Sequence, residues 1–218
     1  MSLNAMFHAK GIAMNDLDFA ALLVSRVCHD LVSPVGAVVN GLEVLEDETD
    51  IAMRADALRL VAASAEQAAA RLQFARIAFG AAGSAGAELD LSEVGRILAG
   101  LLKGGKVELA WQASPVNWPK DWAKLLMNGV LVAADCLPRG GRVVVDTAGD
   151  QNAPSFGISA KGNVVRFGPE AERALLGEPS GMLDGRSIQP YLTYQLSKSL
   201  NAGLTVTPGE GEVRFAAG

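Results

Sequence analysis

Hydrophobic residues in the first third of the chain recur at spacings of three and four, the repeat of an amphipathic helix. One such row lies within residues 16–48, and a second, richer in alanine, lies within residues 51–79. The acidic run EDETD at 46–50 separates them, and Asp16 and Asp50 stand where side chains cap helix starts. We therefore expect two long antiparallel helices joined by a short polar turn. The row of the first helix comprises Leu17, Val24, Val27, Leu31, Val35, Val38, Leu42 and Leu45.

The composition changes abruptly after this hairpin. The stretch GAAGSAG at 80–86 consists of small, uncharged residues, which are typical of a flexible linker. A single hairpin cannot bury both of its faces, whereas two hairpins packed as a four-helix bundle can. The expected organisation is a flexible N-terminal tail at 1–15, a helical hairpin at 16–80, a linker at 81–89 and a second domain at 90–218.

The second domain mixes the two kinds of pattern. Helices are predicted at 91–103, 119–136 and 187–201, and strands at 106–111, 142–147, 155–160, 163–167, 204–207 and 212–215. A Lys-Gly turn at 161–162 and the sequence PGEGE at 208–212 each indicate a β-hairpin. The domain is therefore predicted to be α+β, with helices on one face of a mainly antiparallel sheet.

Composition narrows the possible partners and the compartment. The 218 residues carry a net charge of −5 and no basic run, which argues against a nucleic-acid partner. No stretch approaches ~18 consecutive apolar residues, and the start MSLNAMFHAKG lacks a secretory h-region, so no membrane segment is expected. Cys28 and Cys136 form no CxxC pair, which favours structural thiols in a reducing cytoplasm. A slightly positive mean hydropathy indicates a buried interface and hence an oligomer.

His29 is the residue whose placement suggests chemistry. At ~100° per residue it lies about half a turn away from Leu31 and Val38 on the first helix, so it is predicted to point away from the core. Its own face carries several small or polar residues, which leaves room for a partner to approach. That face comprises Leu22, Ser25, Arg26, Val32, Ser33, Gly36 and Asn40.

An imidazole is partly neutral at physiological pH, so one ring nitrogen of His29 is free to act as a nucleophile. Asp30 is adjacent and is expected to position the ring proton, while Arg26 could neutralise a phosphoryl group. Ser33 could donate a hydrogen bond, and Pro34 frees a backbone carbonyl near position 30. The alternative is an ordinary surface histidine, because exposure alone does not make a nucleophile.

The sequence His-Asp-Leu-Val-Ser-Pro at 29–34 resembles the phosphoacceptor box of dimeric sensor histidine kinases. The longer stretch RVCHDLVSPVGAVVNGLEVLED at 26–47 is more similar to the ChpT-like bacterial histidine phosphotransferases of cell-cycle phosphorelays. This resemblance implies a homodimer in which two hairpins form a four-helix bundle. It also implies that the second domain is a Bergerat-type, kinase-ATPase-like α/β sandwich.

The nucleotide motifs of such kinases are incomplete in this chain. In NGVLVAADCLPRGGRVVV at 128–145, Asn128 matches the first asparagine of the kinase motif, but Val132 replaces the second and offers no lone pair to magnesium. Residues 164–178 contain no aspartate to bind adenine, and IQPYLTYQLSKSL at 188–200 replaces the glycine-rich phosphate loop. We therefore expect no ATP binding, no cofactor and no metal of the chain's own.

The resemblance implies that a phosphoryl group is relayed between receiver-domain aspartates through His29, with Mg²⁺ supplied by the partner receiver. The expected partners are response-regulator receivers and the receiver of a hybrid histidine kinase. The residues assigned to catalysis are His29, Asp30, Arg26 and Ser33, and those assigned to docking are Leu22, Ser25, Val32, Gly36 and Asn40. Two alternatives remain open: an active histidine kinase with a divergent nucleotide site, and a non-enzymatic dimeric scaffold for response regulators.

Overall fold

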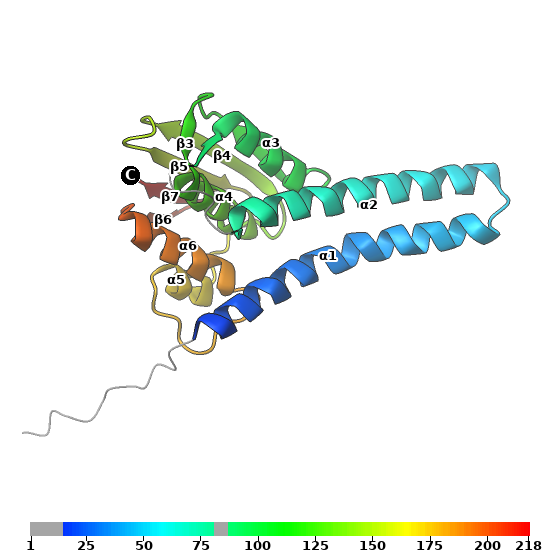
Figure 1. Cartoon of the computed structure of the whole chain (residues 1–218), viewed down its shortest axis with the longest axis horizontal. Helices are drawn as coiled ribbons and strands as arrows, with labels where there is room; N and C mark the ends of the chain where they lie inside the picture. Colours follow the sequence, from blue (N-terminus) through cyan, green and yellow to red (C-terminus); the bar gives the residue numbers. More distant parts are fainter. Residues whose placement is uncertain (1–14, 81–86) are drawn as a thin grey trace, which may run out of the picture.

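The computed structural model describes residues 15–80 and 87–218. The predicted N-terminal tail, with its histidine His8, and most of the predicted linker lie outside these residues. The chain begins with two long antiparallel helices, α1 (Asp16–Asp47) and α2 (Ile51–Ala78), and continues into an α/β domain. Figure 1 shows the hairpin projecting from this domain, so that its base is packed and its tip is free. The predicted hairpin is confirmed.

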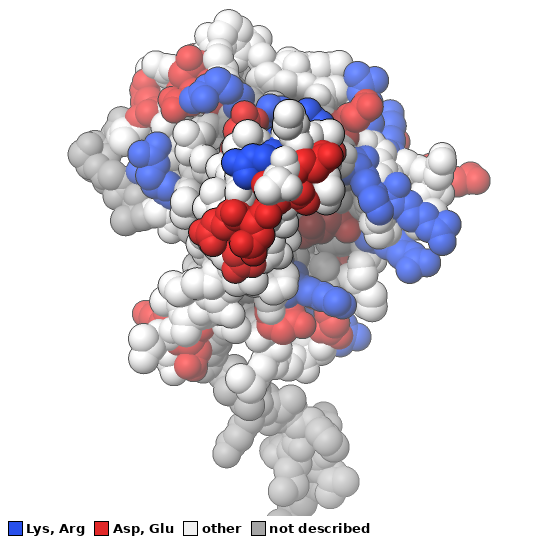
Figure 2. All heavy atoms as spheres, turned by 90° about the vertical axis from the view of Figure 1, so that its right-hand side faces the viewer, with Lys and Arg blue, Asp and Glu red and all other residues white. Residues whose placement is uncertain are grey.

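Polar caps fix both ends of the hairpin turn and the start of α1. Asp50 accepts hydrogen bonds from the backbone N–H groups of Ala52 and Met53, at 2.9 and 3.0 Å, as predicted. At the start of α1 the cap is Asn15, which accepts from Asp18 N, so the prediction of Asp16 was one residue late. The acidic turn lies at the hairpin tip, and Figure 2 shows acidic side chains gathered at this end of the molecule.

The apolar row of α1 divides into two surfaces. Val27, Leu31, Val38 and Leu45 are half-buried, whereas Leu17, Val24, Val35 and Leu42 are exposed. The two helices approach closely at Gly41, where an added Cβ would lie 2.6 Å from the Val61 Cγ2 atom of α2. Half of the predicted apolar row of α1 therefore packs within the chain, and the other half remains exposed.

The second domain contains a five-stranded sheet with the strand order β2-β4-β5-β7-β6. The β2 and β4 strands are parallel and the other pairs are antiparallel. A separate short antiparallel pair joins β1 to β3. The elements are β1 (Glu88–Asp90), α3 (Leu91–Leu102), β2 (Val107–Trp111), β3 (Asn117–Pro119), α4 (Lys120–Asp135), β4 (Gly141–Ala148), β5 (Ser155–Lys161), α5 (Pro169–Leu175), α6 (Ile188–Leu200), β6 (Thr205–Gly209) and β7 (Glu212–Ala217).

One face of the sheet forms the core. Side chains alternate across each strand, so Val143, Val145, Ile158 and Phe215 are buried against the helical layer. The central helix α4 is buried along almost its whole length. Figure 1 shows α3, α4 and α6 on the same side of the sheet. The predicted α+β layering is confirmed.

The predicted strand at 163–167 is wrong. Both edges of β5 are already paired, with β4 and β7, so no ladder position is left for a strand following the Lys-Gly turn. The segment is a loop that packs against the edge of the core instead: Arg166 N donates to Cys136 O at 2.8 Å, and the Phe167 ring packs edge-on against Phe215. Its alternating apolar residues serve loop packing. The sequence also did not reveal the short elements β1, β3 and α5.

By length and composition α1 is apolar enough to cross a bilayer, although no such segment was expected from the sequence. Helices of non-membrane proteins also pass this test, so the observation is weak. The helix lies along α2, and its Arg26 forms an ion pair with Asp30. Part of its apolar surface therefore already has a protein partner.

Replacing Gly41 with alanine should lower the stability of the hairpin. The new Cβ would overlap Val61, whose side chain is stiff in a helix, and overpacking usually costs ~1–3 kcal/mol. Gly36→Ala is the matched control, because a Cβ there meets no atom within 4 Å and helix propensity alone should add up to ~1 kcal/mol. Thermal unfolding followed by circular dichroism measures both. Equal stabilisation by the two substitutions would contradict the close approach at Gly41.

Candidate active site around His29

His29 projects from the outer surface of α1, with its side chain 86% exposed. This confirms the predicted orientation away from the core. The ring is not isolated, because its Nδ1 atom lies 3.4 Å from Asp30 Oδ1. With a proton on Nδ1, the ring donates to Asp30 and leaves the Nε2 lone pair facing solvent. The site therefore presents one nucleophilic nitrogen with a carboxylate behind it.

Arg26 holds the Asp30 carboxylate from the other side. Its Nε atom donates to Asp30 Oδ2 at 3.0 Å, across one helical turn. Its Nη1 atom donates to the backbone oxygen of Gly185 in the second domain at 2.7 Å, and Nη2 lies 3.8 Å from Asp135 Oδ2. Because the Arg26 side chain is only 15% exposed, it does not face an incoming phosphoryl group. The predicted role of Arg26 is corrected: it holds Asp30 and joins α1 to the second domain.

The carbonyl that Pro34 leaves free has a partner that sequence reasoning missed. In a helix the carbonyl of residue 30 accepts from the N–H of residue 34, and proline has none. Arg71 of α2 fills this place: its Nη1 atom donates to Asp30 O at 2.6 Å. The signal in the sequence was the proline itself, which predicts an unpaired carbonyl, but nothing local identifies a donor 41 residues away.

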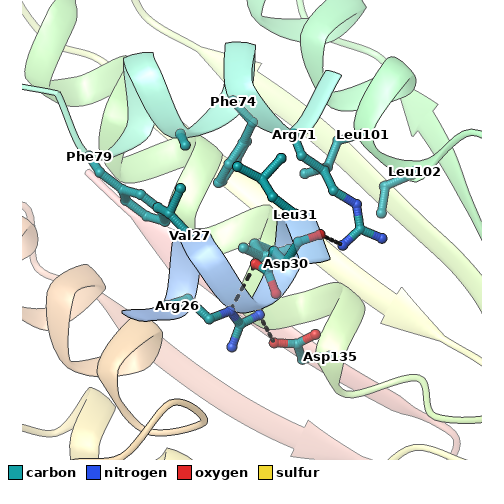
Figure 3. A pocket seen from close by; sticks show the side chains of 12 residues that line it. Arg26, Val27, Asp30, Leu31, Arg71, Phe74, Phe79, Leu101, Leu102 and Asp135 are labelled. Carbon is teal, nitrogen blue, oxygen red and sulfur yellow. Dashed lines mark hydrogen bonds and ion pairs between the residues drawn. The ribbon is translucent and has the colours of Figure 1, made fainter. Parts of the chain in front are cut away.

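Beneath Asp30 is a cavity of about 230 Å³ between the hairpin and the second domain. In Figure 3 Arg26 lies between Asp30 and Asp135, while Arg71 reaches across from α2 to the Asp30 backbone. Asp135 is at the end of α4, with its side chain 56% exposed. Partial burial raises the pKa of the Asp135 carboxyl, the Arg26 charge opposes this rise, and the Asp30 charge adds to it. The cavity is thus bordered by two arginines and two carboxylates.

The predicted docking face is largely available. Ser25, Val32 and Asn40 are exposed, and space is open around Gly36. Ser33, which was assigned to catalysis, is exposed beside them. Leu22 is the exception.

Leu22 packs with Phe19 against a small cluster of the second domain that contains Leu183 and Ile188. The start of α1 rests there, with the rings of Phe19 and Tyr191 edge to face at 6.0 Å. The assignment of Leu22 to docking is therefore corrected, because its side chain is used to seat α1.

Asn128 has a structural role. It is fully buried, and its Nδ2 atom donates to Lys124 O at 2.7 Å and to Ala78 O, at the end of α2, at 3.3 Å. Its Oδ1 atom accepts from Gln189 of α6. Val132, one turn along, is 2% exposed and carries no ligand atom. Among residues 15–80 and 87–218, no three His, Cys, Asp or Glu side chains are grouped as a metal site.

The two cysteines differ in environment. Cys28 is exposed on α1, although the sequence favoured a structural thiol at this position. Cys136 is buried, and its Sγ atom donates to Val132 O at 3.3 Å. Burial, with a smaller effect of the Asp135 charge, raises the pKa of the Cys136 thiol to about 12. Cys136 is therefore a structural residue, as predicted.

Comparison with known proteins identifies relatives of the whole chain. Residues 91–212 match the family model "Histidine phosphotransferase C-terminal domain". Protein phosphotransferase ChpT of Brucella abortus (strain 2308) is 39% identical over 207 residues, covering 94% of this chain and 98% of the relative. The 1.7 Å structure of a bacterial phosphotransferase superposes with a TM-score of 0.84 at 36% identity, covering 95% of this chain and 98% of the other.

Histidine kinases are more distant. The Acinetobacter baumannii histidine kinase AdeS aligns at 12% identity with a TM-score of 0.46, covering 87% of this chain and 95% of the kinase. That likeness is too low to support a conclusion.

In a Cys28→Ser protein, where Cys136 is the remaining thiol, iodoacetamide at pH 8 should label nothing in the native state. The thiol is buried and stays protonated far below its pKa of about 12, and only the thiolate reacts. Labelling should become complete in guanidinium, where unfolding exposes the thiol. Mass spectrometry counts the adducts, and rapid labelling of the native protein would contradict the buried position of Cys136.

Proposed function

This chain belongs to the histidine phosphotransferase family, and on that basis we propose that His29 is the residue that carries the phosphoryl group between the aspartates of two receiver domains. The observation that carries the proposal is the exposed imidazole with its Nδ1 atom beside Asp30. A phosphorelay requires that the nucleophile enter the active site of another protein, and the exposed position of His29 allows this. A histidine packed inside the hairpin could not do so.

The transfer step can be written with the residues present. The Nε2 lone pair of neutral His29 attacks the phosphorus of a receiver's aspartyl phosphate. A P–N bond forms, the P–O bond to the aspartyl group breaks, and the aspartate leaves as a carboxylate with the electron pair. The ring, which keeps its Nδ1 proton, becomes positively charged, and the adjacent Asp30 carboxylate stabilises that charge. The reverse step delivers the group to a second receiver.

Mg²⁺ is assigned to the partner receiver, whose acidic pocket would hold the ion so that its positive charge offsets that of the phosphoryl oxygens. This assignment is consistent with the site, since Arg26 is bound to Asp30 and Gly185 and is not available for that task. Ser33 is exposed one turn beyond His29 and is positioned to donate to a phosphoryl oxygen. The docking face then comprises Ser25, Val32, Gly36 and Asn40.

A kinase reaction on ATP is less well supported. Asn128 matches the first asparagine of the kinase motif, but its side chain is already hydrogen-bonded to Ala78, Lys124 and Gln189. Valine at 132 offers no ligand to magnesium. We therefore place the energy source for phosphohistidine in the receiver's acyl phosphate, which is a high-energy group, and propose response-regulator and hybrid-kinase receivers as cytoplasmic partners.

The uncovered half of the α1 row supports a homodimer. Val35, Val39 and Leu42 are each close to half exposed, at 49%, 48% and 48%. On α2, Leu58 and Leu72 are two heptads apart and are 57% and 52% exposed. Apolar residues at heptad spacing on two adjacent helices are the surface that a four-helix bundle buries. A second copy of this chain is the proposed occupant, and His29 lies about a third of a turn away from that surface.

His29→Gln should abolish phosphoryl uptake from a receiver domain that carries a labelled aspartyl phosphate. The measurement is protein-bound label that is lost in acid but kept in alkali, as expected for phosphohistidine. His8→Gln is the matched control and should take up label normally.

The same assay separates the alternatives. Label retained in the His29→Gln protein would disprove the assignment of His29. Label taken directly from γ-labelled ATP by the wild type would favour the kinase. Tight receiver binding without any transfer would favour the scaffold.

Leu42→Glu should convert the dimer to a monomer, because it places a charge in the middle of the proposed interface. Val44→Glu is the control: Val44 is also exposed, at 43%, but lies about half a turn from Val35 on α1. Multi-angle light scattering measures the molar mass in solution, which is compared with the 22.7 kDa of one chain. A wild-type mass of one chain, or equal behaviour of the two variants, would contradict the proposed interface.

A further inference from the structure

We propose that Arg71 of α2 is a positioning residue for the phosphotransfer reaction, acting through the backbone carbonyl of Asp30 that Pro34 leaves without a helical partner. This inference rests on the proposed role of His29 and adds a residue from the second helix to it. Arg71 touches no reacting atom. Its effect passes through the peptide unit that carries Asp30, next to His29 in the chain.

The geometry at the carbonyl is specific. Pro34 follows Asp30 by four residues, so the one backbone donor that would normally close this helical turn is missing. Pro34 is buried, which limits the water available on that side of the helix. The Arg71 Nη1 atom lies 2.6 Å from the carbonyl oxygen, a short distance typical of a charge-assisted hydrogen bond. Figure 3 shows the guanidinium reaching from α2 to this oxygen.

Two arginines therefore hold Asp30 from different directions. Arg26 binds its carboxylate at 3.0 Å, and Arg71 binds its backbone oxygen at 2.6 Å. The carboxylate that is fixed in this way is the one beside His29 Nδ1. A shift of the Asp30 peptide would move that carboxylate away from the ring, and the preference for the Nδ1–H tautomer would weaken. Nε2 would then carry the lone pair less often.

The energetics favour a functional reason for Arg71. Its Nε atom is buried and has no hydrogen-bond partner among the described residues. The side chain borders the 230 Å³ cavity together with Leu101 and Leu102. Burying a guanidinium with a donor unpaired is costly, and an apolar side chain of similar length often serves stability as well or better. What an apolar side chain cannot supply is the hydrogen bond to Asp30 O.

The proposal makes Arg71 dependent on Pro34. If residue 34 had an N–H group, that group could donate to the Asp30 carbonyl within α1. The hydrogen bond from Arg71 would then no longer be needed to satisfy this carbonyl. Substitutions at the two positions should therefore be strongly non-additive. A residue that merely packs in the cavity would show the same effect whatever occupies position 34.

The experiment compares the wild type with Arg71→Met, Pro34→Ala and the double variant, using the full chain. Arg76→Met is the control, an exposed arginine five residues further along α2. The probe is phosphoramidate, which transfers its phosphoryl group to a histidine nitrogen as its P–N bond breaks and ammonia leaves. The second readout is ¹⁵N NMR of the imidazoles, which reports the Nδ1–H tautomer fraction at His29 with His8 as an internal reference.

Arg71→Met should slow phosphorylation of His29 by roughly tenfold, within the range seen for misplaced reacting groups, and should lower the Nδ1–H tautomer fraction. In the Pro34→Ala background the same substitution should change the rate by less than about twofold, since the coupling is carried by one carbonyl. Arg76→Met should match the wild type. Arg71→Lys, which retains a charged donor, should recover part of the rate and provides a second test if the methionine variant folds poorly.

The inference is overturned if Arg71→Met matches the wild type, or if it is equally harmful with proline and with alanine at position 34. Both results are compatible with a working phosphotransferase. If the wild type takes no phosphoryl group at His29, the proposed function fails instead. In that case the tautomer fractions of the four proteins still decide whether Arg71 positions the ring.

Discussion

The backbone carbonyl of Asp30 is the group on which the arrangement around His29 depends. Pro34 removes its helical donor, and a carbonyl left unpaired near buried side chains is costly. The Arg71 bond at 2.6 Å satisfies it and at the same time ties α1 to α2 at the level of the reactive residue. With that side of α1 turned toward α2, His29 lies on the outside of the hairpin. A proline that removes one hydrogen bond from the helix thus creates the attachment that orients it.

A single helix, α1, serves several surfaces at once. Val27, Leu31 and Val38 pack toward α2, while Phe19 and Leu22 rest on the second domain. The row containing Val35 and Leu42 remains uncovered, and it is the surface on which the homodimer is proposed to form. The face left over carries His29 and small or polar residues, and under the proposed function it is the face that a receiver must reach. Because each surface fixes the rotation of the same helix, none can shift without moving the imidazole.

The sequence was sufficient for features that depend on local pattern. Periodicity located both helices, Asp50 was identified as a cap, and the angular position of His29 followed from the helical repeat. The sequence was insufficient where a side chain or a strand edge is bound by a segment that lies far away in the chain. The Arg26 guanidinium donates a hydrogen bond to the backbone oxygen of Gly185, which is 159 residues away in the chain. No local sequence pattern predicts that this loop lies beside α1. The segment at 163–167 has strand-like alternation, yet both edges of β5 are occupied by strands whose pairing only the whole sheet determines.

The second domain also acts on the site through its contacts with the base of the hairpin. Asn128, the residue that matches a kinase motif, now joins the end of α2 at Ala78 to α4 and α6. Phe74 and Ile77 of α2 belong to the main core of the second domain, and Arg26 of α1 is bound to its Gly185 loop. The second domain therefore packs against and hydrogen-bonds to both helices at the base of the hairpin. Losing it would release Arg26, and with it the Asp30 carboxylate beside His29, so the domain supports the site mechanically.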